Sequence, residues 1–158
     1  MKMSKKVGVA IVGIIFLVAL VSAVPVDATK EFSVHRWWSE VYWTGAPFSD
    51  IEWTGTITTE DGKEGTIYWD NLESFVLGPE DAPKVQKFWG VWWIDWSDGG
   101  YIKGSHSGSY TSAISQCTIN GHITETSADW SYLDGRKIHT VNYVDMVLYY
   151  IAHYLQIN

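Results

Sequence analysis

Tryptophans are concentrated in one short segment, residues 88–96, with the sequence Phe-Trp-Gly-Val-Trp-Trp-Ile-Asp-Trp. Alternate side chains of a β-strand point to opposite faces, so the aromatic rings of this segment would be divided between two faces. One face would carry Phe88, Trp92, Ile94 and Trp96, and the other Trp89, Val91, Trp93 and Asp95. Only one of these faces can belong to the core. The other would need a covering element, or would be exposed as a platform.

Exposed indoles beside a carboxylate are suited to stacking on sugar rings and hydrogen-bonding their hydroxyls, and exposed apolar patches mark binding surfaces. We therefore predict a ligand-binding surface, with ordinary core packing as the alternative. Its residues would be Trp89, Trp92, Trp93, Trp96 and Asp95.

Three histidines could form a metal site. His106, His122 and His139 fall in three successive predicted strands, and suitable loop centres would align them in a row. Imidazole nitrogens are common zinc ligands, but adjacent strands would present them in a line rather than a tetrahedron. His122 also shares its strand face with polar residues. We therefore predict no metal site and no cofactor, and keep the histidine row as the alternative.

Other catalytic patterns have little support. Ser105 and Ser107 flank His106, but neighbours on a strand point to opposite faces. The sequence contains no nucleophile elbow, His-Glu-x-x-His helix or phosphate-binding loop. The pairs Asp95 with Asp98 and Asp70 with Glu73 would suit glycoside hydrolysis only at the right separation. Catalytic residues are therefore left unassigned, and a non-catalytic function is favoured.

The elements that must position these residues are strands. The length of 158 residues fits one domain with a short appendage, and 46% hydrophobic with 18% charged residues excludes a disordered chain. Short runs of β-branched and aromatic residues predict strands over 32–43, 52–60, 63–70, 85–96, 101–110, 117–126 and 136–145. Residues 146–157 fit both helical and strand periodicity, and their Tyr, Ile and Val content favours a closing strand.

Asp61-Gly62 is the preferred sequence for a two-residue type I′ hairpin turn. This turn would place Ile57 opposite Thr66 and Gly55 opposite Tyr68. A tyrosine ring would then cover the gap that a strand glycine leaves.

Sequential antiparallel strands must hide their edges, and closure into a small barrel is the simplest solution, with a β-sandwich as the alternative. Residues 98–108, 120–124 and 133–137 resemble the glycine-punctuated strands of small calycin-like barrels of the allene oxide cyclase and dirigent type. The resemblance implies a ligand in an apolar barrel cavity, and several members of these families are exported. The families' catalytic carboxylates have no clear counterparts here, so no active site is transferred.

The N-terminus has the pattern of an export signal, with Lys2, Lys5 and Lys6 before an uncharged stretch over residues 7–26. We predict a signal peptide over residues 1–28 and a domain over residues 29–158, which makes the protein secreted or cell-surface. The small-residue rule fits cleavage after Ala23 or after Ala28. An uncleaved membrane anchor over residues 7–26 is the alternative. Cys117, the only cysteine, would be a small buried hydrophobe in a strand.

The charge balance excludes a nucleic-acid backbone as a favoured partner. The net charge is -7, and it falls to -9 without residues 1–28, which carry three basic residues and one acidic residue. We predict non-covalent binding of an apolar small molecule or a glycan. The alternatives are a barrel-cyclase-like enzyme, and a surface protein that forms homo-oligomers through Tyr149, Tyr150 and Tyr154.

Overall fold

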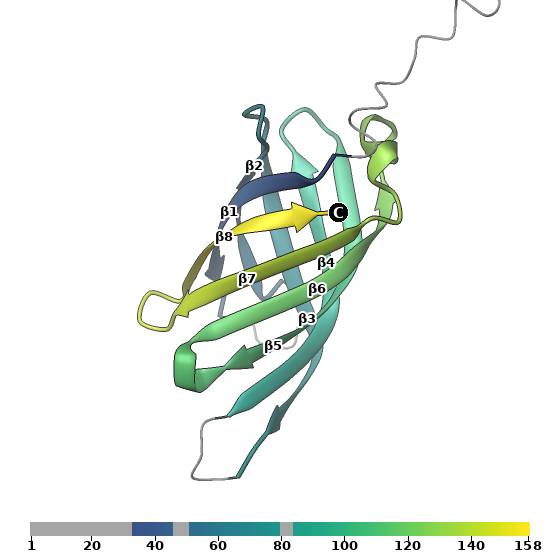
Figure 1. The fold of residues 1–158 in the computed structure, drawn as a ribbon. Helices are drawn as coiled ribbons and strands as arrows, with labels where there is room; N and C mark the ends of the chain where they lie inside the picture. The colour runs from purple at the N-terminus through teal and green to yellow at the C-terminus, as the bar shows by residue number, and fades with distance from the viewer. Residues whose placement is uncertain (1–32, 46–50, 80–83) are drawn as a thin grey trace, which may run out of the picture. The chain divides into compact units, whose positions relative to one another are not determined.

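Eight antiparallel strands form a closed barrel in which each strand pairs with its neighbours in the sequence (Figure 1). The computed structural model describes residues 33–45, 51–79 and 84–158. The strands are β1 (His35–Trp43), β2 (Trp53–Thr58), β3 (Glu64–Leu77), β4 (Val85–Trp96), β5 (Tyr101–Thr111), β6 (Gln116–Thr126), β7 (Lys137–Asp145) and β8 (Tyr150–Ile157). The all-β barrel prediction is confirmed, while the predicted signal helix and its alternative, the anchor over residues 7–26, lie outside the described residues.

Pairing between the first and last strands closes the barrel. Trp37 lies opposite Leu155 and Val41 opposite Ile151, in an antiparallel register that runs the length of both strands. β8 thus confirms that a strand is formed within residues 146–157. Because closure removes free strand edges, the barrel needs no second sheet.

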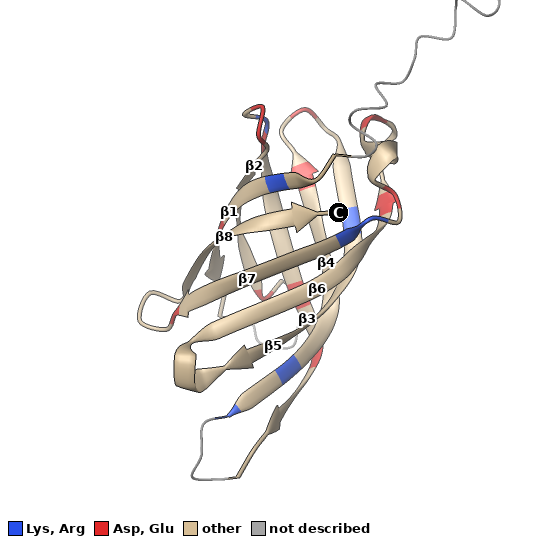
Figure 2. Ribbon diagram, viewed as in Figure 1, with Lys and Arg blue, Asp and Glu red and all other residues tan. Residues whose placement is uncertain are grey.

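Alternation along β4 places its side chains as the sequence predicted. Trp92 and Ile94 are fully buried and Trp96 is 3% exposed, whereas Trp89 and Val91 on the other face are each 38% exposed. The even-numbered face of this strand is therefore the core. Charged residues lie mainly at turns and strand ends, and most of the strand length is uncharged (Figure 2).

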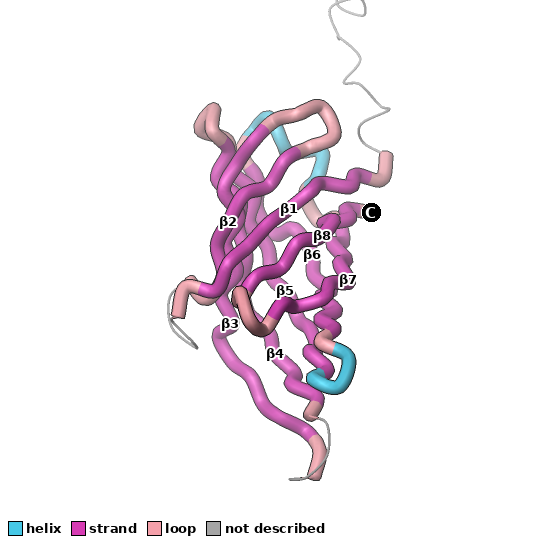
Figure 3. The backbone as a smooth tube through the Cα atoms, turned by 90° about the vertical axis from the view of Figure 1, so that its left-hand side faces the viewer, coloured by secondary structure: helices cyan, strands magenta, loops and turns pink. Residues whose placement is uncertain are grey.

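Stacked indoles fill one end of the barrel. The short helical turn η2 (Ala128–Leu133) carries Trp130, whose ring stacks on Trp96 with centroids 4.7 Å apart, and Trp37 meets both rings edge-on. The second turn, η1 (Ser112–Ile114), lies at the opposite end (Figure 3). These indoles and Leu133 fill this half of the barrel interior. Any cavity must therefore lie in the other half.

The β2–β3 hairpin forms as predicted, but its turn and register differ by one residue. Ile57 pairs with Gly65, not Thr66, and Gly55 pairs with Ile67, not Tyr68. The loop has three residues, because the Thr59 N–H donates to the Lys63 carbonyl and Gly62 takes a φ of 85°. This is the three-residue hairpin with a left-handed glycine, so the predicted type I′ turn is wrong.

At Gly90, the paired strands β3 and β4 approach each other closely. It lies opposite the irregularity between Asp70 and Glu73 on β3, and a Cβ atom at this position would lie 1.8 Å from the Asp70 carbonyl oxygen. Gly90→Ala should therefore lower the free energy of unfolding by about 2–3 kcal/mol, measured by urea denaturation. Val91→Ala, on the exposed neighbour, should cost less than about 1 kcal/mol. Equal losses in the two variants would show that this close approach does not limit the fold.

Candidate functional site

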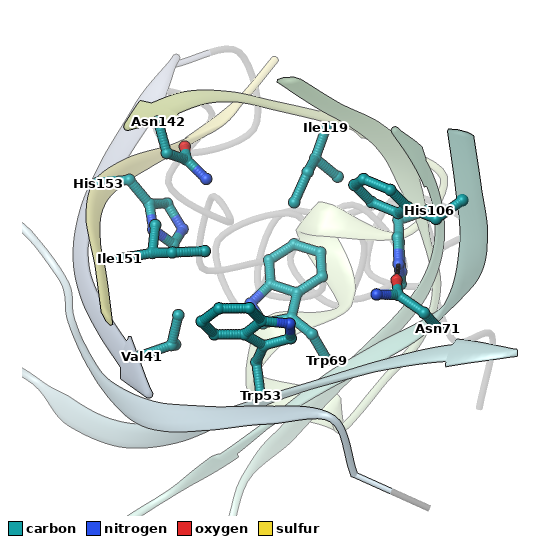
Figure 4. A pocket seen from close by; sticks show the side chains of 10 residues that line it. Val41, Trp53, Trp69, Asn71, His106, Ile119, Asn142, Ile151 and His153 are labelled. Atoms are coloured by element: carbon teal, nitrogen blue, oxygen red, sulfur yellow. Dashed lines mark hydrogen bonds between the residues drawn. The ribbon is translucent and has the colours of Figure 1, made fainter. Parts of the chain in front are cut away.

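A cavity of about 40 Å³ lies inside the half of the barrel that the indoles leave open (Figure 4). Its apolar wall consists of Val41, Trp53, Trp69, Phe88, Ile119 and Ile151, and its polar wall of Asn71, His106, Asn142 and His153. Every one of the eight strands contributes a lining residue. The cavity is therefore a product of closure, and no single hairpin could form it.

One side of the cavity is organised by a hydrogen-bond relay from Glu52 through Asn71 to His106. The Asn71 amide nitrogen donates to the Glu52 carboxylate, and Asn71 Oδ1 lies 2.8 Å from His106 Nε2. An amide oxygen only accepts, so His106 must carry its proton on Nε2. Its Nδ1 atom is then a lone-pair acceptor, and it has no hydrogen-bond partner within the described part of the chain.

The other side of the cavity carries Asn142 and His153. The Thr140 hydroxyl donates to Asn142 Oδ1 at 2.5 Å, so the Asn142 amide nitrogen remains as a donor. Among residues 33–45, 51–79 and 84–158, neither this nitrogen nor either ring nitrogen of His153 has a hydrogen-bond partner. Asn142 is 2% exposed and His153 4% exposed, so these are buried polar groups.

Trp69 contacts both imidazoles. Its ring centroid lies 5.1 Å from that of His106, in an edge-on arrangement, and 6.5 Å from that of His153. Figure 4 shows His106 and His153 on opposite sides of the interior. A molecule in the cavity would therefore contact the Trp69 indole and have a polar wall at each end.

Burial sets the protonation states of the site. It lowers the pKa of His106 and of His153 to about 4, so both rings are neutral at pH 7. Burial, together with the charge of Asp70, raises the pKa of Glu52 to about 7 against the opposing hydrogen bond from Asn71. Burial also raises the pKa of Cys117 to about 12, so its thiol stays protonated and is a poor nucleophile.

The structure divides the predicted tryptophan surface between the two sides of the barrel wall. Trp92 and Trp96 are core residues, whereas Trp89, Trp93 and Asp95 point outward. Trp93 stacks on Tyr68 with centroids 4.9 Å apart. The five residues therefore do not form one surface, and only the outward three could act together.

The three histidines of the alternative metal site are also separated. His106 lies opposite Gly121 and points inward, while His122 lies opposite Ser105 and points outward. His139 is on the outer wall, where it pairs with Asn120 at 2.8 Å. In the described ranges, no three His, Cys, Asp or Glu side chains lie close enough together to hold a metal ion.

Sequence reasoning missed most of the cavity wall. His153 stands between Ile151 and Leu155 on the inward face of β8, and Asn142 stands between Thr140 and Val144 on that of β7. A polar residue at the centre of a buried strand face was the available signal. Glu52 and Asn71 gave no such signal, because only the barrel register brings them to His106.

The fold defines the class of the protein as a closed, eight-stranded up-and-down antiparallel β-barrel. Comparisons of the chain with models of known families, with curated proteins and with solved structures find no match in any of the three. The resemblance to allene oxide cyclase and dirigent barrels stays a prediction. Nowhere in the described part of the chain is there a helix of the length and hydropathy needed to cross a membrane.

The buried titratable groups predict opposing effects of pH on stability. The lowered pKa values of the two histidines make the fold lose stability as pH falls from 6.5 toward 4, because the unfolded chain binds the protons. The raised pKa of Glu52 makes the fold lose stability as pH rises from 4.5 through about 7, because the folded chain then holds the extra proton.

Glu52→Gln should therefore gain stability relative to the native chain as pH rises from 4.5 to 8. Full conversion of the pKa shift would give about 3 kcal/mol, and solvent near the barrel end reduces this to about 2 kcal/mol. Urea denaturation across this pH range measures the difference. Glu64→Gln, the same change at an exposed residue of β3, is the matched control. A constant difference between Glu52→Gln and the native chain would contradict the burial of a carboxylate at this position.

Proposed function

We propose that the protein is an exported, non-catalytic binding protein that holds an apolar small molecule inside its barrel. One observation carries the proposal. Three buried polar side chains that line the cavity, His106, Asn142 and His153, have hydrogen-bonding atoms without a partner among the described residues. An unpaired buried polar group costs about 1–3 kcal/mol, so a bound molecule that satisfies several of them would stabilise the fold.

The aromatic wall supports an apolar body for this ligand. Trp53, Trp69 and Phe88 line the cavity with Ile119 and Ile151. Binding cavities typically combine such a wall with a few polar groups that fix the orientation of the ligand. The cavity of this barrel has both an apolar wall and a few polar groups.

Binding is favoured over a barrel-cyclase type of catalysis by the protonation states. The raised pKa of Glu52 would suit acid–base work near neutral pH, but Glu52 is not among the residues that line the cavity. Asn71 stands between Glu52 and His106, and an amide does not pass on a proton in the way an imidazole does. The relay therefore orients His106 rather than delivering a proton.

Export and cell-surface location remain part of the proposal and rest on residues 1–28. The basic start and the uncharged stretch over 7–26 support them. Mass spectrometry of the N-terminus of the protein from its native cell would show cleavage near Ala23 or Ala28. An intact N-terminus in the membrane fraction would instead favour the anchor.

A groove of about 440 Å³ on the outer wall favours glycan binding as the second candidate function. Trp89 and Phe75 form its aromatic side, with their rings edge-on at 5.7 Å. The hydroxyl and amide groups beside them come from Ser107, Ser109, Thr118 and Asn120. An exposed indole next to hydroxyl-bearing strands suits stacking and hydrogen bonding to a sugar ring.

Filling the cavity should separate interior binding from binding elsewhere. Val41→Phe places a ring in the cavity and should weaken binding of an apolar ligand by roughly tenfold or more. The full-length protein would be titrated with short alcohols and fatty acids while its tryptophan emission is recorded. Val91→Phe, the same change on the outer wall, should leave the affinity unchanged. Equal affinities of both variants for every ligand would place the site outside the barrel.

The glycan alternative has its own paired test. Trp89→Ala should weaken binding to an immobilised polysaccharide by about tenfold, because a stacked ring contributes on the order of 1 kcal/mol or more. Trp38→Ala is the control, since Trp38 is equally exposed, at 38%, on β1. Retention that is insensitive to Trp89, or absent in the native protein, would remove this candidate.

A further inference from the structure

The polarity of hydrogen bonding differs between the two sides of the cavity. On the His106 side, the relay from Glu52 leaves Nδ1 as an acceptor, so a bound group must donate to it. On the Asn142 side, the bond from Thr140 leaves the amide N–H groups as donors, so a bound group must accept from them. His153, beside Asn142, has one donor and one acceptor when neutral, and therefore accommodates either polarity.

Charge restricts the ligand further. Of the ten described residues that line the cavity, none is Lys or Arg, so no fixed cation is present to neutralise an anion. The titratable groups around this space are His106 on β5, His153 on β8, Cys117 on β6, and Glu52 and Asp70 next to β2 and in β3. Asp70, and Glu52 where its carboxyl group is ionised, add negative charge near this space and disfavour an anionic ligand.

A single ionised group also fails to match both sides. A carboxylate only accepts hydrogen bonds and would leave His106 Nδ1 without a donor. An ammonium group only donates and would leave the Asn142 N–H groups without an acceptor. A hydroxyl group does both, so a neutral hydroxyl satisfies either side.

Size limits the length of the molecule. The cavity volume of about 40 Å³ exceeds the roughly 10–15 Å³ that one water molecule needs, so the space admits a molecule of a few heavy atoms but no long chain. His106 lies across the interior from Asn142 and His153, with Trp69 between them (Figure 4). The two polar sides are therefore separated by a short apolar span over an indole.

We infer that the cavity is built for a short neutral molecule with a hydroxyl group at each end and an apolar middle, such as a small diol. One end donates to His106 Nδ1, the other accepts from Asn142, and the carbon atoms between them pack on Trp69. The inference rests on the proposed interior binding function, and it specifies the ligand class for that site.

A set of three-carbon probes tests the inference on the full-length protein. 1,3-Propanediol, 1-propanol, malonate and 1,3-diaminopropane share one carbon chain and differ in their end groups. Tryptophan emission and isothermal titration would measure their affinities at pH 7.5. The diol should bind in the millimolar range, as its few heavy atoms allow, and roughly tenfold more tightly than 1-propanol. The two charged probes should bind more weakly than the diol.

Asn142→Leu keeps the size of the side chain and removes the donor on one side of the cavity. In this variant the diol should lose its roughly tenfold advantage over 1-propanol. Asn158→Leu, the same change at an exposed residue next to β8, should leave that advantage intact. Circular dichroism would confirm that each variant is folded, and the four-probe series on the native protein stands if Asn142→Leu does not fold.

Each outcome bears on a different statement. Equal binding of diol and 1-propanol would overturn the two-ended ligand while leaving interior binding in place. Preference for malonate or the diamine would overturn the neutral class. Binding of no probe would show that water alone meets the polar atoms, and the inference would fail. The proposed function would fail separately if Val41→Phe altered no interaction in the wider ligand panel.

Discussion

The pairing of β8 with β1 is the constraint on which the rest of the structure depends. An eight-stranded barrel encloses a space just wide enough for side chains, so its contents are decided by which residues the closed register turns inward. At one end the register stacks Trp96 and Trp130, with Trp37 against them. At the other it turns imidazole and amide groups inward, which fill less space. The cavity therefore lies in the half that the smaller polar side chains occupy.

The polar half of the interior is only partly satisfied by the protein itself. Asn71 uses both ends of its amide, one toward Glu52 and one toward His106. Asn142 uses only its oxygen, and His153 uses neither ring nitrogen within the described residues. Proteins rarely keep such groups without water or a ligand, and those that do often keep them at a functional site. The site proposed here follows from this imbalance and from the neutral state that burial imposes on both imidazoles.

The sequence predicted the parts of this fold that local patterns control. The alternation in β4 separated Trp92 and Trp96 from Trp89 and Trp93, and the need to hide strand edges predicted a closed barrel. Register was harder, because a shift of one residue moves every side chain to the other face. That shift separates His106 from His122, since Gly121 takes the position opposite His106. The β2–β3 turn shows the same sensitivity, because Asp61-Gly62 fits two loop lengths.

The cavity itself depended on information that no local pattern contains. Val41 and His153 are far apart in the chain, yet both line the same space, because β1 and β8 are neighbours. The tryptophan-rich segment predicted a binding surface on β4. The two tryptophans that line the cavity, Trp53 and Trp69, come instead from β2 and β3. The one local signal that the sequence offered was a polar residue at the centre of an apolar strand face, as at Asn142 and His153.

Closure by the last strand also governs when the chain can fold during its synthesis. Leu155 pairs with Trp37, and residue 157 with residue 35, so the barrel stays open until residues 150–157 have left the ribosome. Contacts this distant in sequence form slowly, because a long loop must close first. Until β8 has been synthesised, the nascent chain therefore has no finished barrel, and the edge of β1 that β8 covers stays unpaired.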